Sequence, residues 1–148
     1  MIIYDINIPE FSLSNLNLIH YAQELNIPNF RGVFMRDTLP KNPRMKECVI
    51  VNLNTSKQKG SHWVAYWKSG KKRIYFDSFG QITPVEIQKY LKTKHEFNKN
   101  TLCIKRNTDI VQAENTCICG HLCLYVLKSL ADGKNFQDTL NTLQHYNV

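Results

Sequence analysis

The segment from residue 62 to residue 79 constrains the fold of this chain more than any other part of the sequence. It reads HWVAYWK, then SGKK, then RIYFDSF, so two apolar and aromatic runs flank a short polar turn. This pattern predicts two antiparallel strands, 62–68 and 73–79, joined as a β-hairpin. The hairpin places the beginning of one strand beside the end of the other, which brings His62 and Asp77 into the same neighbourhood.

The rest of the chain predicts helices and short strands around this hairpin. Apolar spacing and turn residues indicate the following elements: a helix over 12–26 with Ser12 or Ser14 as N-cap and Leu16 among its apolar positions; an irregular loop over 30–46 with a short strand; a buried strand over 48–54; a helix from Thr83 to Leu91 with a capping box of Thr83 and Glu86; a strand over 101–106; a buried helix over 119–131 that Gly133 ends; and an amphipathic helix over 136–146. The order predicts an α+β fold, a small mixed β-sheet flanked by helices, in one domain spanning 1–148.

Nothing in the sequence suggests export or a membrane partner. The N-terminal MIIYDINIPEF lacks the basic region and long apolar block of a signal peptide. No run approaches the roughly 18 apolar residues that a membrane span needs. We therefore expect a protein that is not secreted and whose five cysteines stay reduced. The net charge of +7 favours polyanions such as nucleic acid as partners.

Residues 112–127, QAENTCICGHLCLYVL, concentrate three cysteines and a histidine. Zinc would need four converging ligands, but the spacing of Cys117, Cys119, His121 and Cys123 points them to different sides of a helix. Cys123, and with less support Cys117, are explained as buried filler. Cys119 is the candidate nucleophile because it begins a buried helix, where free N–H groups stabilise a thiolate. Next to it, Gly120 would let a substrate chain approach closely.

A nucleophilic thiol needs a base, and the base needs an orienting group. His62 is the best candidate base, since it opens a predicted strand at the edge of the sheet. Asp77 at the other end of the hairpin would hold its tautomer and stabilise the imidazolium. Gln112, seven residues before Cys119, would donate a hydrogen bond to the negative oxygen of a tetrahedral intermediate. Each residue taken singly has an ordinary structural explanation.

In the order His, Asp, Gln, Cys, the segments GSHWVAYW, IYFDSFG and Q-x6-C-G resemble the adenovirus-type maturation cysteine proteases. This adenain-like group has relatives in virophages and in Polinton/Maverick elements. The resemblance covers about residues 12–131 and implies a papain-like/adenain-like cysteine protease fold. It also implies cleavage of viral capsid precursor proteins, typically after glycine, inside the virion or the host cell.

The resemblance assigns roles to individual residues. It makes Cys119 the nucleophile, His62 the general base, Asp77 the orienting group and Gln112 the oxyanion donor, with Trp63 shaping the substrate site beside the histidine. No metal or other cofactor is implied, although the family's use of DNA and of an activating peptide makes either a possible activator. We expect a monomer that acts on polypeptides and also contacts DNA.

Two alternative functions, and expectations for residues 30–40 and for Cys103, complete the predictions from the sequence. Asp77 stands where adenoviral members usually have glutamate, and SUMO and ubiquitin-like-protein proteases use aspartate in a similar YFDS setting, so such a deconjugating protease is an alternative. A basic nucleic-acid-binding domain is another, although 68–73 and 92–99 read more simply as a turn and a solvated loop. Residues 30–40 are a candidate substrate groove, and Cys103 is expected to be buried in its strand.

Overall fold

The computed structural model describes residues 1–57, 62–93 and 102–146. Its elements, in chain order, are β1 (Ile2–Ile3), β2 (Ile6–Asn7), α1 (Asn15–Glu24), β3 (Phe30–Met35), β4 (Lys46–Asn52), β5 (Trp63–Ser69), β6 (Lys72–Phe76), α2 (Val85–Leu91), β7 (Cys103–Arg106), α3 (Cys119–Ala131) and α4 (Phe136–Tyr146). Residues 94–99 of the predicted solvated loop, and the first residue of the strand predicted over 101–106, lie outside the described ranges.

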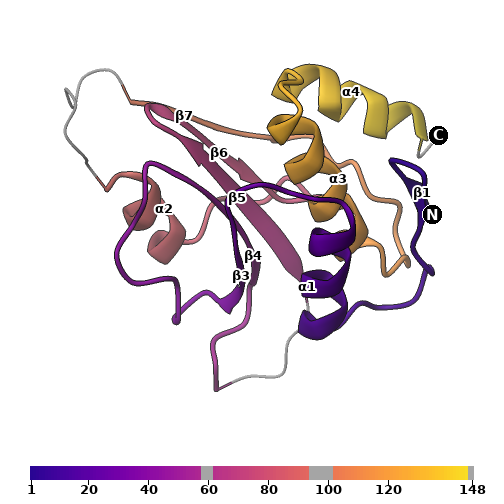
Figure 1. The fold of residues 1–148 in the computed structure, drawn as a ribbon, viewed down its shortest axis with the longest axis horizontal. Helices are drawn as coiled ribbons and strands as arrows, with labels where there is room; N and C mark the ends of the chain where they lie inside the picture. Colours follow the sequence, from indigo (N-terminus) through magenta and orange to yellow (C-terminus); the bar gives the residue numbers. More distant parts are fainter. Residues whose placement is uncertain (58–61, 94–101, 147–148) are drawn as a thin grey trace.

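One mixed sheet organises the molecule, with strand order β3-β4-β5-β6-β7 (Figure 1). The three central strands pair antiparallel, whereas the outer strands β3 and β7 run parallel to their neighbours. The predicted hairpin is confirmed as β5 and β6, which turn at Gly70 with φ of 61°. Glycine suits this left-handed backbone because it has no Cβ.

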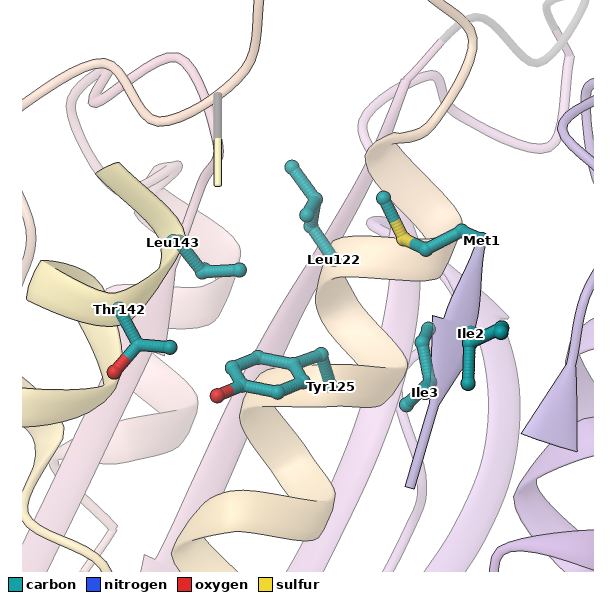
Figure 2. A pocket seen from close by; sticks show the side chains of 7 residues that line it. All are labelled: Met1, Ile2, Ile3, Leu122, Tyr125, Thr142 and Leu143. Carbon is teal, nitrogen blue, oxygen red and sulfur yellow. The ribbon is translucent and has the colours of Figure 1, made fainter. Parts of the chain in front are cut away.

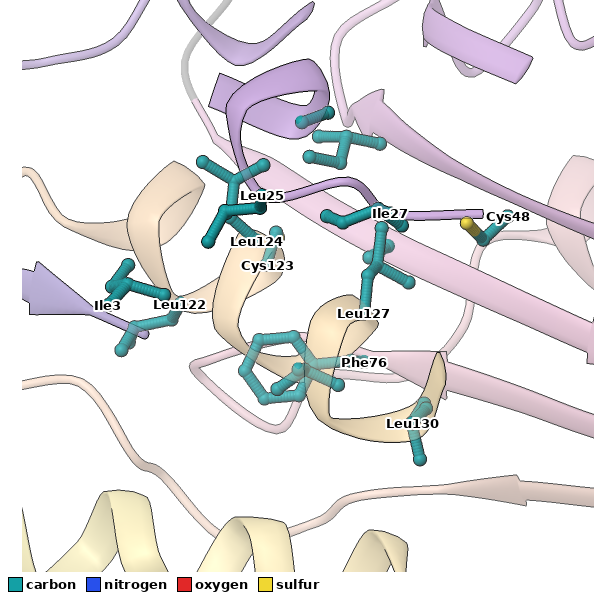
Figure 3. Close-up of a cluster of buried hydrophobic side chains, with 14 of the residues drawn as sticks. Ile3, Leu25, Ile27, Cys48, Phe76, Leu122, Cys123, Leu124, Leu127 and Leu130 are labelled. Atoms are coloured by element: carbon teal, nitrogen blue, oxygen red, sulfur yellow. The ribbon is translucent and has the colours of Figure 1, made fainter. Parts of the chain in front are cut away.

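The central strands are buried on both faces, since alternate side chains enter two different apolar clusters. Cys48, Ile50, Ile74 and Phe76 face a large cluster built with α1, α3 and α4. Figure 3 shows α3 contributing Leu122, Cys123, Leu124, Leu127 and Leu130 to it. The opposite face packs against α2 through a smaller cluster. The helix α3 is thus held by burial along its whole length, which fixes the position of its first residue.

The predicted helix ends are partly right. Ser14 caps α1 in a capping box with Asn17, as one of the two proposed caps. Leu16, however, is 72% exposed, because the buried face of α1 carries Leu18 and Ala22 instead. The predicted Thr83 cap is wrong: α2 begins one residue later, with Pro84 at the cap and no side-chain cap hydrogen bond.

The helices α3 and α4 match their predicted bounds. The turn between them closes through Gly133 with φ of 85°, whose N–H donates to Leu130 O. An apolar hollow lies where β1, α3 and α4 meet, lined among others by Ile3, Leu122 and Leu143 (Figure 2). Among the described helices, none combines the length and the apolar character that a membrane crossing requires.

The basic segment 68–73 contains the predicted turn at Gly70, and two of its charged side chains lie inside the protein. Lys68 and Arg73 are buried. The Lys68 ammonium lies 3.4 Å from the buried carboxylate of Glu47, and the Arg73 guanidinium donates to Thr93 O at 2.8 Å. Burial of ions requires such partners. Two of the charges in this segment therefore serve the packing of α2 on the sheet and are not available to a polyanion.

Candidate active site

The ends of three elements meet at one end of the sheet. His62 immediately precedes β5, and Asp77 immediately follows β6. The antiparallel register, with Ala65 opposite Phe76, sets these two residues side by side. Cys119 is the first residue of α3, which packs across β5. Residues 57 positions apart in the sequence, His62 and Cys119, are thereby brought together.

The His62 imidazole is held from two sides. Its Nε2 lies 2.7 Å from Asp77 Oδ1. Its ring stacks on Phe79, with the ring centroids 5.0 Å apart. Burial lowers the pKa of His62, but the hydrogen bonds to Asp77 and to Cys119, together with the charges of both partners, outweigh this and raise the pKa to about 9. Since Nε2 faces Asp77, Nδ1 is the nitrogen left for the thiol.

The Cys119 sulfur lies in a setting that favours the thiolate. Burial opposes ionisation, but a hydrogen bond from His62, the N–H groups of Trp63 and Gly120, and the charge on the imidazole together lower the pKa of Cys119. The beginning of a helix adds its positive dipole end. These influences favour transfer of the thiol proton to His62, which is the state that a cysteine nucleophile requires.

Asp77 is fixed by a residue that the sequence reasoning missed. The side chain of Asn107 accepts from Asp77 N–H at 3.1 Å and donates to Asp77 O at 2.6 Å. The Asp77 carboxylate is buried, and its Oδ1 also accepts from Phe79 N–H at 2.9 Å. An asparagine just after a short strand is the only signal for this role, and it is common in ordinary turns.

The turn after Asp77 approaches the segment that carries Asn107 very closely. Gly80 has φ of 65°, and a Cβ at this position would lie 2.4 Å from Thr108 O. Only glycine satisfies both conditions. The turn over 77–80 and the segment over 107–109 are therefore packed main chain against main chain next to Asp77.

Gln112 is buried near the same end of the sheet. Its Oε1 accepts from Ser78 Oγ at 2.6 Å, and its Nε2 donates to Thr116 O and Thr116 Oγ1, both at 3.0 Å. The amide thus lies next to the Asp77–Ser78 segment, but its donors are directed at the loop that leads to Cys119. Its role as an oxyanion donor stays a prediction.

Trp63 and Gly120 lie close to each other, near the N-terminal end of α1. The Trp63 indole N–H donates to Leu13 O at 3.0 Å. A Cβ on Gly120 would lie 3.0 Å from Leu18 Cδ2 and 3.4 Å from Trp63 Cδ1. We expected open space for a substrate beside Gly120, but the side chains of Leu18 and Trp63 lie on the side where a Cβ would point. A substrate contact at Trp63 stays a prediction.

Among the other thiols, the prediction that Cys123 is buried is confirmed, whereas those for Cys117 and Cys103 are wrong. Cys123 and Cys48 are buried, and burial raises the pKa of each, to about 12 for Cys48. Cys117 is exposed and is not buried filler. Cys103 is also exposed, because it lies on the edge strand β7, all four residues of which are exposed. All five cysteines, including Cys119, are free thiols.

The zinc reading of residues 117–123 finds no support in the geometry. His121 is fully buried, and its Nε2 donates to Pro9 O at 2.7 Å. Across the ranges that the structure describes, His, Cys, Asp and Glu side chains form no group of three or more able to hold a metal ion.

The candidate substrate groove over 30–40 is mostly the edge strand β3. Its end lies at the same end of the sheet as His62, because Arg36 N–H donates to Asn52 O and Asn52 pairs with Trp63. The segment is placed to flank a bound substrate, and its part in binding stays a hypothesis.

Comparisons with known proteins give one consistent picture. The family model described as adenovirus endoprotease matches residues 30–145. A protein named "Protease" from Equine adenovirus B serotype 2 is 33% identical over 99 residues, which is 60% of this chain and 49% of that protein. The chain thus spans about half the length of this curated relative.

Solved structures show the fold. The crystal structure of the ASFV pS273R protease superposes with a TM-score of 0.57 at 18% identity, covering 87% of this chain and 61% of that one. Its selenomethionine form gives 0.57 at 16% identity, over 88% and 62% of the two chains. This likeness confirms the predicted adenain-like fold.

Proposed function

Because the chain belongs to the adenovirus endoprotease family, we propose that it is a cysteine endopeptidase with Cys119 as nucleophile, His62 as general base and Asp77 as orienting group. The observation that carries the proposal is the hydrogen-bonded chain from Asp77 through His62 to Cys119, with the thiol pKa lowered and the imidazole pKa raised. Opposite pKa shifts in adjoining groups are typical of catalytic sites.

The reaction proceeds through a thioester. The Cys119 thiolate attacks the scissile carbonyl carbon, and the carbonyl π electrons move onto oxygen. The protonated His62 then gives its Nδ1 proton to the leaving amine as the C–N bond breaks. Water, losing a proton to His62, attacks the thioester, and the acid product departs while the thiolate reforms. Asp77 holds Nε2–H throughout, which keeps Nδ1 aimed at sulfur and substrate.

The oxyanion is stabilised by the Cys119 main-chain N–H and by the Gln112 side-chain amide. In the present structure the Gln112 donors bind Thr116. A substrate oxyanion must therefore replace Thr116 as the acceptor of one of these N–H groups. Removing one oxyanion donor typically costs about 10²–10³ in kcat.

Viral precursor proteins cut after small residues such as glycine are the proposed substrates, in the virion and the host interior. The adenoviral origin of the relative supports this choice. A protease of SUMO-like or ubiquitin-like conjugates is the second candidate, since Asp77 replaces the glutamate usual in adenoviral members. We further propose that the protein acts as a monomer, needs no metal, and binds DNA or an activating peptide if it is regulated as in the family.

Peptide cleavage by two matched cysteine variants tests the proposal. The wild-type chain, Cys119→Ala and Cys117→Ala would be incubated with capsid precursors and with a ubiquitin-like protein extended beyond its Gly-Gly terminus. Cys119→Ala should lose all cleavage, while Cys117→Ala keeps it. A dead Cys117→Ala with an active Cys119→Ala would show that the wrong thiol was chosen. Salt-sensitive DNA binding without any hydrolysis would favour the nucleic-acid-binding alternative.

A further inference from the structure

The Gln112 side chain is held at both ends inside the protein. Gln112 is only 4% exposed and Ser78 is fully buried. The Ser78 hydroxyl donates to Gln112 Oε1 at 2.6 Å, which is a short contact for two neutral groups. The two residues are 34 positions apart in the sequence. The main chains are also joined, because Val111 N–H donates to Ser78 O at 2.8 Å.

These partners fix which end of the amide is oxygen and which is nitrogen. Thr116 O is a carbonyl and only accepts, so the Gln112 nitrogen must face it. The Gln112 oxygen then faces Ser78, whose hydroxyl can donate. The reversed amide would bring two oxygens together at Thr116. The contacts with Ser78 and with Thr116 O are thus both satisfied by one orientation of the Gln112 amide. In this orientation both amide N–H groups point away from Ser78 and toward the loop before Cys119.

We propose that Ser78 is a positioning residue for hydrolysis, which holds the Gln112 amide with its N–H groups ready for the oxyanion. The proposal rests on the proposed function. Ser78 directly follows Asp77, so adjacent residues of one turn would set the orientation of the base and of the oxyanion donor. This turn is itself fixed by Asn107 and by the close approach at Gly80.

Loss of the Ser78 hydroxyl leaves Gln112 Oε1 buried without this donor, and a buried acceptor without a partner is unfavourable. The amide is then anchored at one end only, through its contacts with Thr116, so its position is less restricted and its donors are misplaced for part of the time. Because the oxyanion exists only after attack, the loss acts on the transition state and spares substrate binding. We expect Ser78→Ala to lower kcat by at least about tenfold, and by no more than the roughly 10²–10³-fold typical of losing an oxyanion donor outright, with KM changed by less than about twofold.

The experiment compares kcat and KM for the wild-type chain, Ser78→Ala, Gln112→Ala and the double variant. If Ser78 acts through Gln112, the double variant should be no slower than Gln112→Ala. Alkylation of Cys119 by iodoacetamide forms no oxyanion, so its rate and pH profile should be the same in all four chains. Ser129→Ala is the matched control, since Ser129 is also fully buried and bonds Tyr4 OH at 2.8 Å toward the far end of α3. It should lose stability and keep kcat.

Independent losses that add in the double variant, or a wild-type kcat in Ser78→Ala, would overturn the inference while leaving the protease assignment intact. A changed alkylation profile in Ser78→Ala would overturn it as well, because the effect would then lie in the thiolate pair. If circular dichroism shows that Ser78→Ala does not fold, Ser78→Cys takes its place, because the thiol is a weak donor of similar size. This variant should have a kcat between those of the wild type and Gln112→Ala, and a wild-type kcat would contradict the inference. A wild-type chain without Cys119-dependent hydrolysis would overturn the proposed function itself.

Discussion

Replacing Asp77 with asparagine separates the charge of this residue from its shape. Asparagine has the same outline, and its Oδ1 can still accept from Phe79 N–H and from His62 Nε2. The negative charge beside the imidazole is lost. Of the two negative groups that raise the pKa of His62, the thiolate then remains, so the pKa of His62 should fall and that of Cys119 should rise.

The size of the effect follows from the imidazole. Although burial opposes protonation, the pKa of His62 rises from about 6.5 to about 9, which corresponds to about 3 kcal/mol in favour of the protonated ring. The hydrogen bond to Asp77 is the largest of the raising causes. Losing half of this preference, about 1.5 kcal/mol, would change the thiolate population near neutral pH by roughly tenfold.

The assay is the rate of iodoacetamide alkylation of Cys119 as a function of pH, with the modified peptide identified by mass spectrometry. The inflection should move upward by about one pH unit in Asp77→Asn, and kcat/KM at pH 7 should fall by at least about tenfold. Asp132→Asn, which removes a carboxylate that pairs with Lys128 at 3.3 Å, controls for the change in net charge. Identical pH curves for Asp77→Asn and wild type would refute the reasoning.

Three other substitutions test the packing and the ionisation of buried groups. Gly80→Ala adds a Cβ where φ is 65°, and this Cβ would lie 2.4 Å from Thr108 O. The substitution should lower the free energy of unfolding, measured in urea, by at least about 2 kcal/mol, and an unchanged urea midpoint would contradict the close approach. Trp63→Phe removes the donor to Leu13 O and should cost about 1 kcal/mol, seen as a lower Tm. Burial lowers the pKa of His121, so the unfolded chain takes up its proton first and stability should fall as pH drops below about 6.5. His121→Gln should flatten that part of the stability curve, and an equal slope in both chains would assign the loss to other groups.

The sequence was informative wherever a local pattern determines a structure. Alternation in 62–79 predicted the hairpin, and the hairpin predicted the contact between His62 and Asp77, because antiparallel pairing leaves few other arrangements. The apolar run after Cys119 likewise predicted both ends of α3. These elements carry most of the core and the charged pair of the site.

The burial of a side chain depends on which other elements pack over its helix or strand, and this could not be predicted from local patterns. Cys103 is exposed because β7 is an edge strand, and an edge strand and a central strand can have the same short sequence. Leu16 likewise fits the apolar spacing of α1, but the helix turns its other side to the core. The contacts of Ser78 and Asn107 join segments that only the complete fold brings together, so no local pattern distinguishes these residues from ordinary turn residues.

The Cys119 thiol belongs to α3, whereas the His62 imidazole that favours its ionisation belongs to the β5–β6 hairpin. While α3 is apart from the hairpin, Cys119 is a cysteine of ordinary acidity, only a few per cent ionised at neutral pH. The lowered pKa of this thiol is therefore a property of the tertiary structure, because His62 and Trp63 reach it only when the two units are packed together.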